Sequence, residues 1–369
     1  MHECTIIGGG VIGLSLAWEL AGRGRSVLLV ERGRLGREAS WAGAGILPPA
    51  RWETARHPME QLRAWSNRLY PEWSARLLET TGIENGFRPC GGLYLARTAG
   101  EAAGLSAFAA ELAADQIATE RWSAAETAER FPALAAAAEE LRYALWLPEE
   151  AQVRNPRHLA ALAAACRAAG VEVREECEIV GFRSAGERVP EIETATGALP
   201  VDSLFLTAGA WTGGLLAQLG VQLELVPIRG QMLLFRTPEP LITCVVNEGP
   251  RYLVPRDDGR MLAGSTEEDV GFDIRTTAEG LADLQHFAHD LLPALRSAPL
   301  EASWAGLRPG THDGYPYLGR LPRFANVLLA TGHFRSGLHL SPATAELIAD
   351  LHEGKPAPLD LTPFSASRG

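Results

Sequence analysis

The sequence predicts an α/β protein in which strand–helix units form a parallel sheet, interrupted by an inserted α+β domain built on an antiparallel sheet. Strand–helix units lie at both ends of the chain, and alternating segments between residues 226 and 265 indicate antiparallel strands. A chain of 369 residues suits two domains. We expect one domain to comprise residues 1–80, 150–222 and 303–369 and the other to comprise residues 81–149 and 223–302.

Composition and charge narrow the class of protein and its partners. Hydrophobic residues make up 46% of the chain and charged residues 21%, as in ordinary globular proteins. The formal net charge of -11 argues against nucleic acid or an anionic membrane surface as a partner. The chain opens on an apolar strand rather than a secretory signal, and no apolar run approaches the ~20 residues that span a bilayer. We therefore expect a cytoplasmic protein with no membrane partner.

The cysteines and histidines do not indicate a metal site. Two histidines, His286 and His289, lie three apart on a predicted helix, but no third ligand is near them. The cysteines are scattered and lack CxxC spacing, which is typical of reduced thiols. They are Cys4, Cys90, Cys166, Cys177 and Cys244.

The N-terminal sequence carries a dinucleotide-binding motif. A short buried strand at residues 5–7 leads into Gly8-Gly9-Gly10-Val11-Ile12-Gly13, which satisfies G-x-G-x-x-G, and a helix follows. Such glycines let the backbone approach a pyrophosphate at the helix N-terminus. Glu31 ends the next strand, where its carboxylate can accept hydrogen bonds from ribose hydroxyls and would repel a 2′-phosphate. This unit predicts a Rossmann-type domain that binds a dinucleotide.

Two further segments favour FAD over NAD. Residues 39–45 (ASWAGAG) are small apart from Trp41 and could wrap the phosphates and run beside a flavin ring, whereas a NAD dehydrogenase needs no such loop. A second glycine-rich turn, Gly332 to Gly337, follows a buried strand and precedes a helix whose N-terminus could stabilise negative charge on a reduced flavin. Two such turns, more than 300 residues apart, predict the extended FAD molecule.

Three other stretches give structural expectations. Residues 87–96 predict a pair of strands around Gly91-Gly92, and the alanine-rich residues 101–141 predict helix. Residues 304–321 are punctuated by glycine and proline and predict irregular structure. The segment that contains Tyr252 predicts a strand at the edge of the antiparallel sheet.

The motifs together resemble the FAD-dependent amine oxidoreductases of the D-amino acid oxidase type, and most closely the glycine oxidases of thiamine biosynthesis. The resemblance spans almost the whole chain and implies a glutathione-reductase-like FAD-binding domain. The segments that carry it are Ile6–Gly13, Ser40–Leu47, Leu206–Thr212, Pro227–Gln231, Tyr252–Arg256, Trp304–Pro316 and Ala330–Pro342.

The motifs and the resemblance together assign a set of residues to FAD. Related sarcosine oxidases attach FAD covalently through a cysteine in the C-terminal portion, but the last cysteine here is Cys244, so we expect non-covalent FAD. A structural role for His333 remains as reasonable as contact with the flavin. The assigned residues are Gly8, Gly10, Val11, Ile12, Gly13, Glu31, Arg32, Ala39, Ser40, Ala44, Gly45, Ile46, Ile179, Gly209, Gly332, His333, Phe334, Ser336, Gly337 and Leu338.

The substrate site needs a cation, because a small amino acid presents a carboxylate. A planar guanidinium binds a carboxylate through two parallel hydrogen bonds. The resemblance implies that Arg308, Arg335 and Tyr252 match the family's substrate-binding positions. The alternatives are a salt-bridged surface arginine in either case, a flavin contact for Arg335, and an ordinary strand tyrosine for Tyr252.

The resemblance implies oxidative deamination of glycine or another small amine, such as sarcosine or a small D-amino acid. The product is an imino acid that hydrolyses to a 2-oxo acid and ammonia, while O₂ is reduced to H₂O₂; a role in thiazole and thiamine biosynthesis and a homo-oligomer are also implied. No acid–base residue is required, because the flavin supplies the redox chemistry. One alternative is a D-amino acid dehydrogenase that passes electrons to another carrier. Another is a non-catalytic redox sensor, against which the settings of Arg308 and Arg335 argue.

Two positions depart from the family pattern near the expected substrate site. Glu267 stands where the best-known glycine oxidases have an apolar side chain, and Pro250-Arg251 replaces a histidine-containing segment before Tyr252. Both departures can change which side chain the substrate carries.

Overall fold

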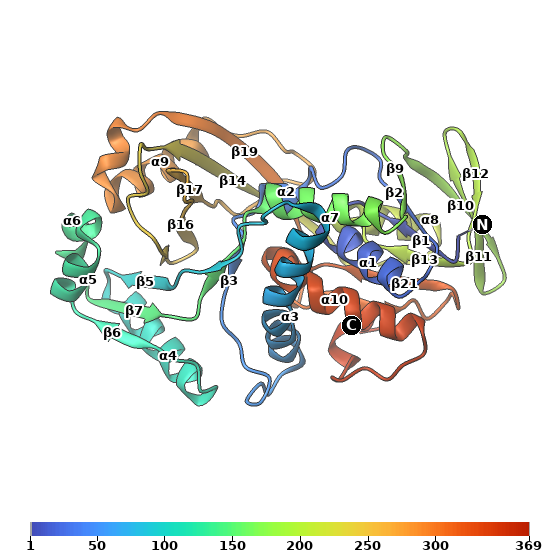
Figure 1. The fold of residues 1–369 in the computed structure, drawn as a ribbon, viewed down its shortest axis with the longest axis horizontal. Coiled ribbons are helices and arrows are strands. Elements are labelled where there is room, and N and C mark those ends of the chain that lie inside the picture. The colour runs from blue at the N-terminus through green and yellow to red at the C-terminus, as the bar shows by residue number, and fades with distance from the viewer. Residues whose placement is uncertain (1, 369) are drawn as a thin grey trace.

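The computed structural model describes residues 2–368 and contains two large sheets, one toward each end of an elongated molecule (Figure 1). One sheet has six strands in the order β20-β21-β13-β1-β2-β9. All neighbours pair in parallel except β20, which is antiparallel to β21, so the predicted parallel sheet of an α/β fold is confirmed. The strands are β1 (Cys4–Ile7), β2 (Val27–Val30), β9 (Glu172–Arg174), β13 (Ser203–Leu206), β20 (Tyr317–Arg320) and β21 (Val327–Thr331).

The central strands of this sheet are apolar at every position because both faces are covered. Phe205 packs among four helices on one face, while its neighbours Leu204 and Leu206 belong to a separate core on the other face. The helices of the first face are α1 (Val11–Gly22), α3 (Pro58–Thr81), α7 (Asn155–Ala168) and α10 (Gly337–His352). The second face carries α8 (Thr212–Gln218) and a small sheet of β10 (Ile179–Ala185), β11 (Arg188–Thr194) and β12 (Gly197–Pro200).

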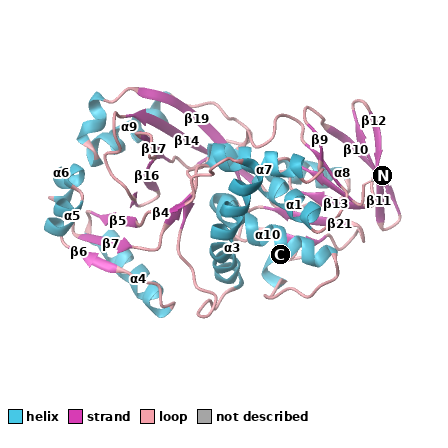
Figure 2. Ribbon diagram, viewed as in Figure 1, coloured by secondary structure: helices cyan, strands magenta, loops and turns pink. Residues whose placement is uncertain are grey.

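The other large sheet has nine strands and is antiparallel apart from the parallel pair β15 and β5. Its strands β14, β16 and β17 lie toward the end of the molecule opposite β13 and β21 of the first sheet (Figure 2). Its order is β18-β14-β17-β16-β15-β5-β7-β6, and β19 pairs with β14. The predicted antiparallel sheet is therefore present. The strands are β5 (Gly92–Ala96), β6 (Glu120–Trp122), β7 (Tyr143–Leu147), β14 (Val226–Arg236), β15 (Val245–Glu248), β16 (Arg251–Pro255), β17 (Arg260–Gly264), β18 (Glu268–Asp269) and β19 (Leu300–Gly310).

Shorter elements complete the fold. A three-stranded sheet joins β3, β8 and β4. Within residues 2–368, no helix combines the length and apolar character needed to cross a bilayer. The remaining elements are α2 (Ala39–Ala42), β3 (Ile46–Leu47), β4 (Arg88–Pro89), α4 (Ala99–Ala114), α5 (Ala124–Arg130), α6 (Ala135–Ala138), β8 (Ala151–Gln152) and α9 (Ala278–Leu291), with 3₁₀ turns at Pro132–Leu134, Gly209–Trp211, Pro293–Ser297, Phe334–Ser336 and Thr362–Phe364.

Two local predictions are wrong. Residues 101–141 are not helical throughout, because β6 separates α4 from α5 and a new capping box at Ser123 starts α5. Residues 87–96 do contain two strands, but they do not pair with each other. Instead β4 pairs with β8 in the small sheet, while β5 pairs with β7 and β15. Composition predicts extended structure in residues 87–96, but it cannot predict which strands they pair with, because that depends on tertiary contacts.

The stretch after Trp304 is also more regular than its glycines and prolines predict. Strand β19 runs through Gly306 and Pro309 and pairs with β14 alone. Proline is compatible with such an edge strand, because the missing N–H would face no neighbouring strand. The predicted domain boundary at residue 303 lies within β19. We propose that the two large sheets mark the two domains and that β19 belongs with the second.

Candidate active site

A cavity of about 800 Å³ lies where the carboxyl ends of the parallel strands meet the nine-stranded sheet. Its wall includes Glu31 after β2, Gly209 after β13, His333 after β21, and Tyr252 on β16. Ligands of open α/β sheets bind outside the carboxyl ends of the strands. All the residues assigned to FAD from the sequence line this cavity except Gly13 and Gly332, and Arg308, Arg335 and Tyr252 line it too.

The glycine motif forms a tight turn at one end of the cavity. Gly8 has φ +109, and a Cβ there would lie 2.6 Å from the carbonyl oxygen of Thr207. The Thr207 hydroxyl donates hydrogen bonds to the carbonyl oxygens of Ile7 (3.0 Å) and Gly8 (2.9 Å). A Cβ at Gly13 would overlap the Gly8 carbonyl oxygen, so Gly13 permits close packing of α1 on this turn without lining the cavity. The turn therefore keeps its backbone open to a ligand.

Gly332 likewise has a role in the backbone conformation rather than in the cavity wall. It has φ +81, and a Cβ there would lie 2.6 Å from Cγ2 of Thr311. The residues that follow it, His333 to Leu338, reach the cavity instead. Burial lowers the pKa of His333 to about 3, and its Nε2 lies 3.2 Å from the Thr344 hydroxyl. His333 is therefore a neutral, hydrogen-bonded residue that also lines the cavity.

Glu31 and Arg32 are held in place at the nucleotide end. Glu31 is only 8% exposed and accepts hydrogen bonds from the N–H groups of Gly9 (2.7 Å) and Gly33 (2.9 Å). A carboxylate has about four lone-pair sites, so two remain for ribose hydroxyls. The Arg32 guanidinium lies 3.7 Å from the ring centroid of Trp211, a residue that the sequence did not single out. Glu31, which follows β2, is therefore positioned to accept hydrogen bonds from a ribose.

The residues present fit FAD. The N-termini of α1 and α10 both reach the cavity, and each offers backbone N–H groups and a partial positive charge to an anionic group. Val11 N–H at the start of α1 donates to the Ser40 hydroxyl at 2.9 Å, which joins the small-residue segment to the glycine motif. A cavity of this size with a ribose acceptor and two helix N-termini matches an extended dinucleotide.

Arg256 ties the nine-stranded sheet to the small-residue segment. Its guanidinium is buried and donates hydrogen bonds to the carbonyl oxygens of Ala44 (2.7 Å) and Val153 (3.2 Å) and to Gln152 Oε1 (2.5 Å). Burial, followed by the charges of Arg154 and Arg88, lowers the pKa of Arg256 to about 9. This side chain fixes the position of a backbone segment that lines the cavity.

No acidic side chain among residues 2–368 forms an ion pair with Arg308. Its Nη2 donates to the Ser265 hydroxyl at 2.6 Å, and its Nη1 donates to the carbonyl oxygens of Thr266 (3.2 Å) and Arg229 (3.5 Å). Burial lowers the pKa of Arg308, while the nearby Tyr252 opposes that shift. All its partners are neutral oxygens, so the guanidinium is fixed in orientation and its charge remains for a ligand.

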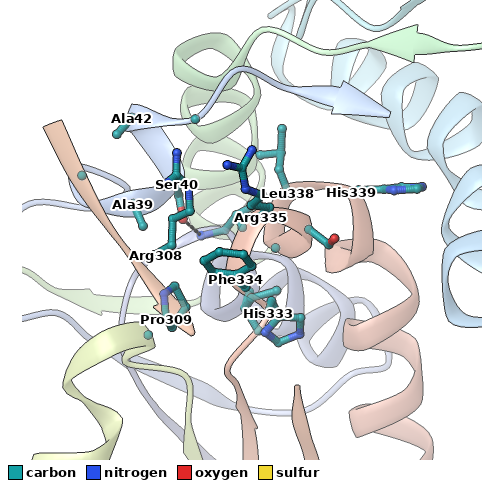
Figure 3. Close-up of a pocket in the computed structure, with 18 of the residues that line it drawn as sticks. Ala39, Ser40, Ala42, Arg308, Pro309, His333, Phe334, Arg335, Leu338 and His339 are labelled. Carbon is teal, nitrogen blue, oxygen red and sulfur yellow. Dashed lines mark hydrogen bonds between the residues drawn. The ribbon is translucent and has the colours of Figure 1, made fainter. Parts of the chain in front are cut away.

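Arg335 differs because an acidic residue neutralises it. Glu267 Oε2 accepts hydrogen bonds from Nη2 (2.6 Å) and Nε (3.1 Å) of Arg335, and Nη1 donates to the Pro250 carbonyl oxygen at 3.4 Å. Arg335 and Glu267 are 32% and 49% exposed, respectively. Figure 3 shows Arg308, Phe334 and Arg335 at the same pocket. Both predicted arginines thus reach the cavity, but only one is free of a carboxylate.

Tyr252 lies inside the sheet rather than at its edge, so that expectation is wrong. Strand β16 has β15 on one side and β17 on the other. Tyr252 is paired with Asn247 on β15, and its hydroxyl lies 3.5 Å from Sδ of Met232. Asn247 and Met232 also line the cavity, although the sequence gave no reason to single them out. Only the strand register shows that these side chains share a face.

A buried carboxyl group, that of Glu150, contacts Asn247 and Tyr94 of the cavity wall. Glu150 is fully buried, and it accepts hydrogen bonds from the Tyr94 hydroxyl (2.6 Å) and from Nδ2 of Asn247 (3.3 Å). Burial raises the pKa of Glu150 to about 7. Both donors line the cavity, so Glu150 positions two groups of its wall.

Comparisons with known proteins agree with this geometry. Residues 3–351 match the family of FAD dependent oxidoreductases (DAO). The chain is 38% identical over 364 residues to the glycine oxidase of Pseudomonas putida, covering 98% of each protein. It is 37% identical to the bifunctional protein ThiO/ThiG of Trichormus variabilis, covering 100% of this chain and 55% of that protein. The crystal structure of glycine oxidase from Geobacillus kaustophilus has a TM-score of 0.94 at 36% identity, covering 100% and 99% of the two chains.

The match to the family extends over nearly the whole chain, and the structure places the residues for a dinucleotide around one cavity. The chain therefore belongs to the DAO family of FAD-dependent oxidoreductases, and it is an FAD-dependent amine oxidoreductase.

Proposed function

We propose that this enzyme oxidises the carbon–nitrogen bond of glycine or another small amine that carries one carboxylate, such as sarcosine or a small D-amino acid. The observation that carries the proposal is the guanidinium of Arg308, which lines the cofactor cavity without an acidic partner among the residues described. The glycine oxidases to which the chain is similar support the same substrate class.

The chain's own residues would bind and orient the substrate. Arg308 would bind the carboxylate through paired hydrogen bonds, since Ser265 and Thr266 already fix the plane of its guanidinium. Tyr252 lies close enough to Arg308 to affect the pKa of the guanidinium. Its hydroxyl would donate a hydrogen bond to the same substrate carboxylate. Holding the substrate in a single orientation lowers the entropic part of the barrier.

Bound FAD would supply the hydride acceptor, and the chain supplies its site. We assign to the cofactor the glycine turn at Gly8, the ribose acceptor Glu31 and the second turn through Gly337. We propose that the cofactor is held without a covalent bond. The one cysteine that lines the cavity is Cys177, and its N–H donates to the Glu31 carbonyl oxygen at the nucleotide end.

We further propose O₂ as the electron acceptor, with the imino acid hydrolysing to a 2-oxo acid and ammonia, and a role in thiamine biosynthesis. The support is the similarity to the glycine oxidases and to the ThiO/ThiG proteins. An FAD-dependent dehydrogenase that uses another electron carrier is the alternative.

An anaerobic bleaching panel followed by admission of air tests substrate and acceptor together. The purified protein should be yellow and should release its flavin on acid denaturation. Glycine, sarcosine or a small D-amino acid should bleach the flavin without oxygen, and air should restore the colour with formation of H₂O₂. If only larger amines without a carboxylate bleach it, the substrate assignment is wrong. If air fails to restore the colour, O₂ is not the acceptor.

A further inference from the structure

We propose that Glu267 restricts the substrate site to amines with a single carboxylate, because it neutralises Arg335, the second of the two arginines assigned to the substrate. This inference rests on the proposed function, since it assigns the substrate carboxylate to Arg308. Among the arginines that line the cavity, Arg308 and Arg335 are the two that we assign to the substrate, and each could bind a carboxylate. Of these two, only Arg335 forms an ion pair with an acidic side chain.

The contacts of Arg335 leave little room for a ligand carboxylate. A guanidinium binds a carboxylate bidentately along one edge, and the Nε–Nη2 edge of Arg335 is already occupied by Glu267 Oε2. The remaining nitrogen, Nη1, is directed to the Pro250 carbonyl oxygen. A second substrate carboxylate would therefore meet the negative charge of Glu267 as well as an occupied guanidinium. A substrate with one carboxylate avoids this repulsion.

The segment that carries Glu267 is anchored on both sides. The residues before it, Ser265 and Thr266, hold Arg308, and the next residue, Glu268, accepts a hydrogen bond from Arg229 at 2.8 Å. Arg229 is itself only 4% exposed and also donates to the Arg275 carbonyl oxygen at 2.9 Å. Four consecutive residues thus contact three arginines. The position of Glu267 is set by this network rather than by its own pair, so removing its carboxylate should leave Arg308 in place.

Replacing the carboxylate by an amide tests the inference. We expect Glu267→Gln to increase kcat/KM for iminodiacetate, which is glycine bearing a second carboxymethyl group, by about tenfold, because the positive charge of Arg335 is no longer neutralised. The same variant should change kcat/KM for glycine by less than about threefold, since that carboxylate is bound by Arg308. An unchanged ratio of the two substrates would overturn the proposal.

Two control variants separate the local contact from a change in overall charge. Glu301→Gln removes a carboxylate from another arginine pair, Arg260–Glu301 at 2.6 Å, and should leave the ratio unchanged. The double variant Glu267→Gln with Arg335→Gln should lose the gain for iminodiacetate. A gain that appears in Glu301→Gln, or that survives in the double variant, would show that Arg335 does not bind the second carboxylate.

Equilibrium binding to the holoenzyme distinguishes this inference from the proposed function. Acetate and malonate carry one and two carboxylates and are not oxidised as amines, and their binding can be followed through the flavin absorbance. Wild type should bind acetate in preference to malonate, and Glu267→Gln should reverse or abolish that preference. If no small amine is oxidised but this reversal occurs, the proposed function fails while the inference holds. If malonate gains nothing in Glu267→Gln, the inference fails whatever the enzyme oxidises.

Discussion

Nη2 of Arg308 lies 2.6 Å from the hydroxyl oxygen of Ser265, and this neutral contact explains how a partly buried cation is positioned without losing its charge. An acidic partner at the same place would have competed with a ligand carboxylate, as Glu267 does at Arg335. The hydroxyl fixes the guanidinium instead. Ser265 therefore orients the Arg308 guanidinium without neutralising its positive charge.

The Ser265→Ala variant should weaken substrate binding, because Arg308 loses the hydrogen bond that orients it. A hydrogen bond to a charged group is worth about 1.5–3 kcal/mol, so the apparent KM for glycine should rise about tenfold or more. Steady-state kinetics measure this, with Ser297→Ala as control, since that hydroxyl bonds only the Ala294 carbonyl oxygen. An unchanged KM in Ser265→Ala would show that Arg308 does not depend on this contact.

The Gly13→Ala variant should lower the thermal unfolding temperature and the flavin content of the purified protein. The added Cβ would overlap the Gly8 carbonyl oxygen and push α1 away from the turn that is assigned to the pyrophosphate. Gly22→Ala is the matched control, because it lies on the same helix and a Cβ there meets no atom within 4 Å. Equal flavin content in the two variants would contradict this role of Gly13.

The Arg256→Met variant should destabilise the fold and loosen the small-residue segment. It leaves the carbonyl oxygens of Ala44 and Val153 without their donor in a buried place. Leaving buried polar groups unpaired costs about 1–3 kcal/mol each, so the loss of two such pairings should lower the free energy of unfolding by about 2–6 kcal/mol. Chemical denaturation measures this loss. A variant as stable as wild type would mean that these carbonyl groups find other donors.

Glu150 should make stability depend on pH in a defined direction. Burial raises its pKa from 4.5 to about 7, so the folded state holds the proton more tightly than the unfolded state does. The stabilisation is complete below about pH 4.5 and is lost as pH rises to about 7, an effect of about 3 kcal/mol. The Glu150→Gln variant should lack this dependence, which denaturation at pH 5 and pH 8 would reveal. Parallel pH profiles for the two proteins would contradict the burial of a titrating carboxyl group.

The nucleotide end of the site could be predicted from the sequence because its signals are local. The motif through Gly13 and the acidic residue Glu31 lie on one strand–helix–strand unit, and spacing alone places them together. Arg308 and Arg335 were recognised from their settings in motifs near the C-terminus. The sequence could not show that Glu267 would pair with Arg335, because the contact joins two distant segments.

The residues of the cavity wall on the substrate side could not be predicted from the sequence, because strand register brings them together. Asn247 and Tyr94 face the same cavity as Tyr252 because β5, β15 and β16 are neighbours in one sheet. That order mixes a parallel pair with antiparallel ones, which no turn sequence specifies. Trp211 was missed for a similar reason, since its contact with Arg32 joins two strand ends of the other sheet. Composition could predict that strands are present, but pairing between segments distant in the sequence determines which residues line the cavity.

Anaerobic flavin reduction by glycine, followed in wild type and in Arg308→Ala by stopped-flow absorbance, measures directly whether Arg308 binds the carboxylate of an amine that reduces the flavin. Glycine or sarcosine should bleach the wild-type flavin, and the rate should saturate with amine concentration. In Arg308→Ala the apparent Kd should rise about tenfold or more, as expected for loss of a charged hydrogen-bonded contact. If neither amine bleaches the wild-type flavin, the enzyme does not oxidise small amines of this class. If Arg308→Ala binds glycine as tightly as wild type, Arg308 does not bind the substrate carboxylate.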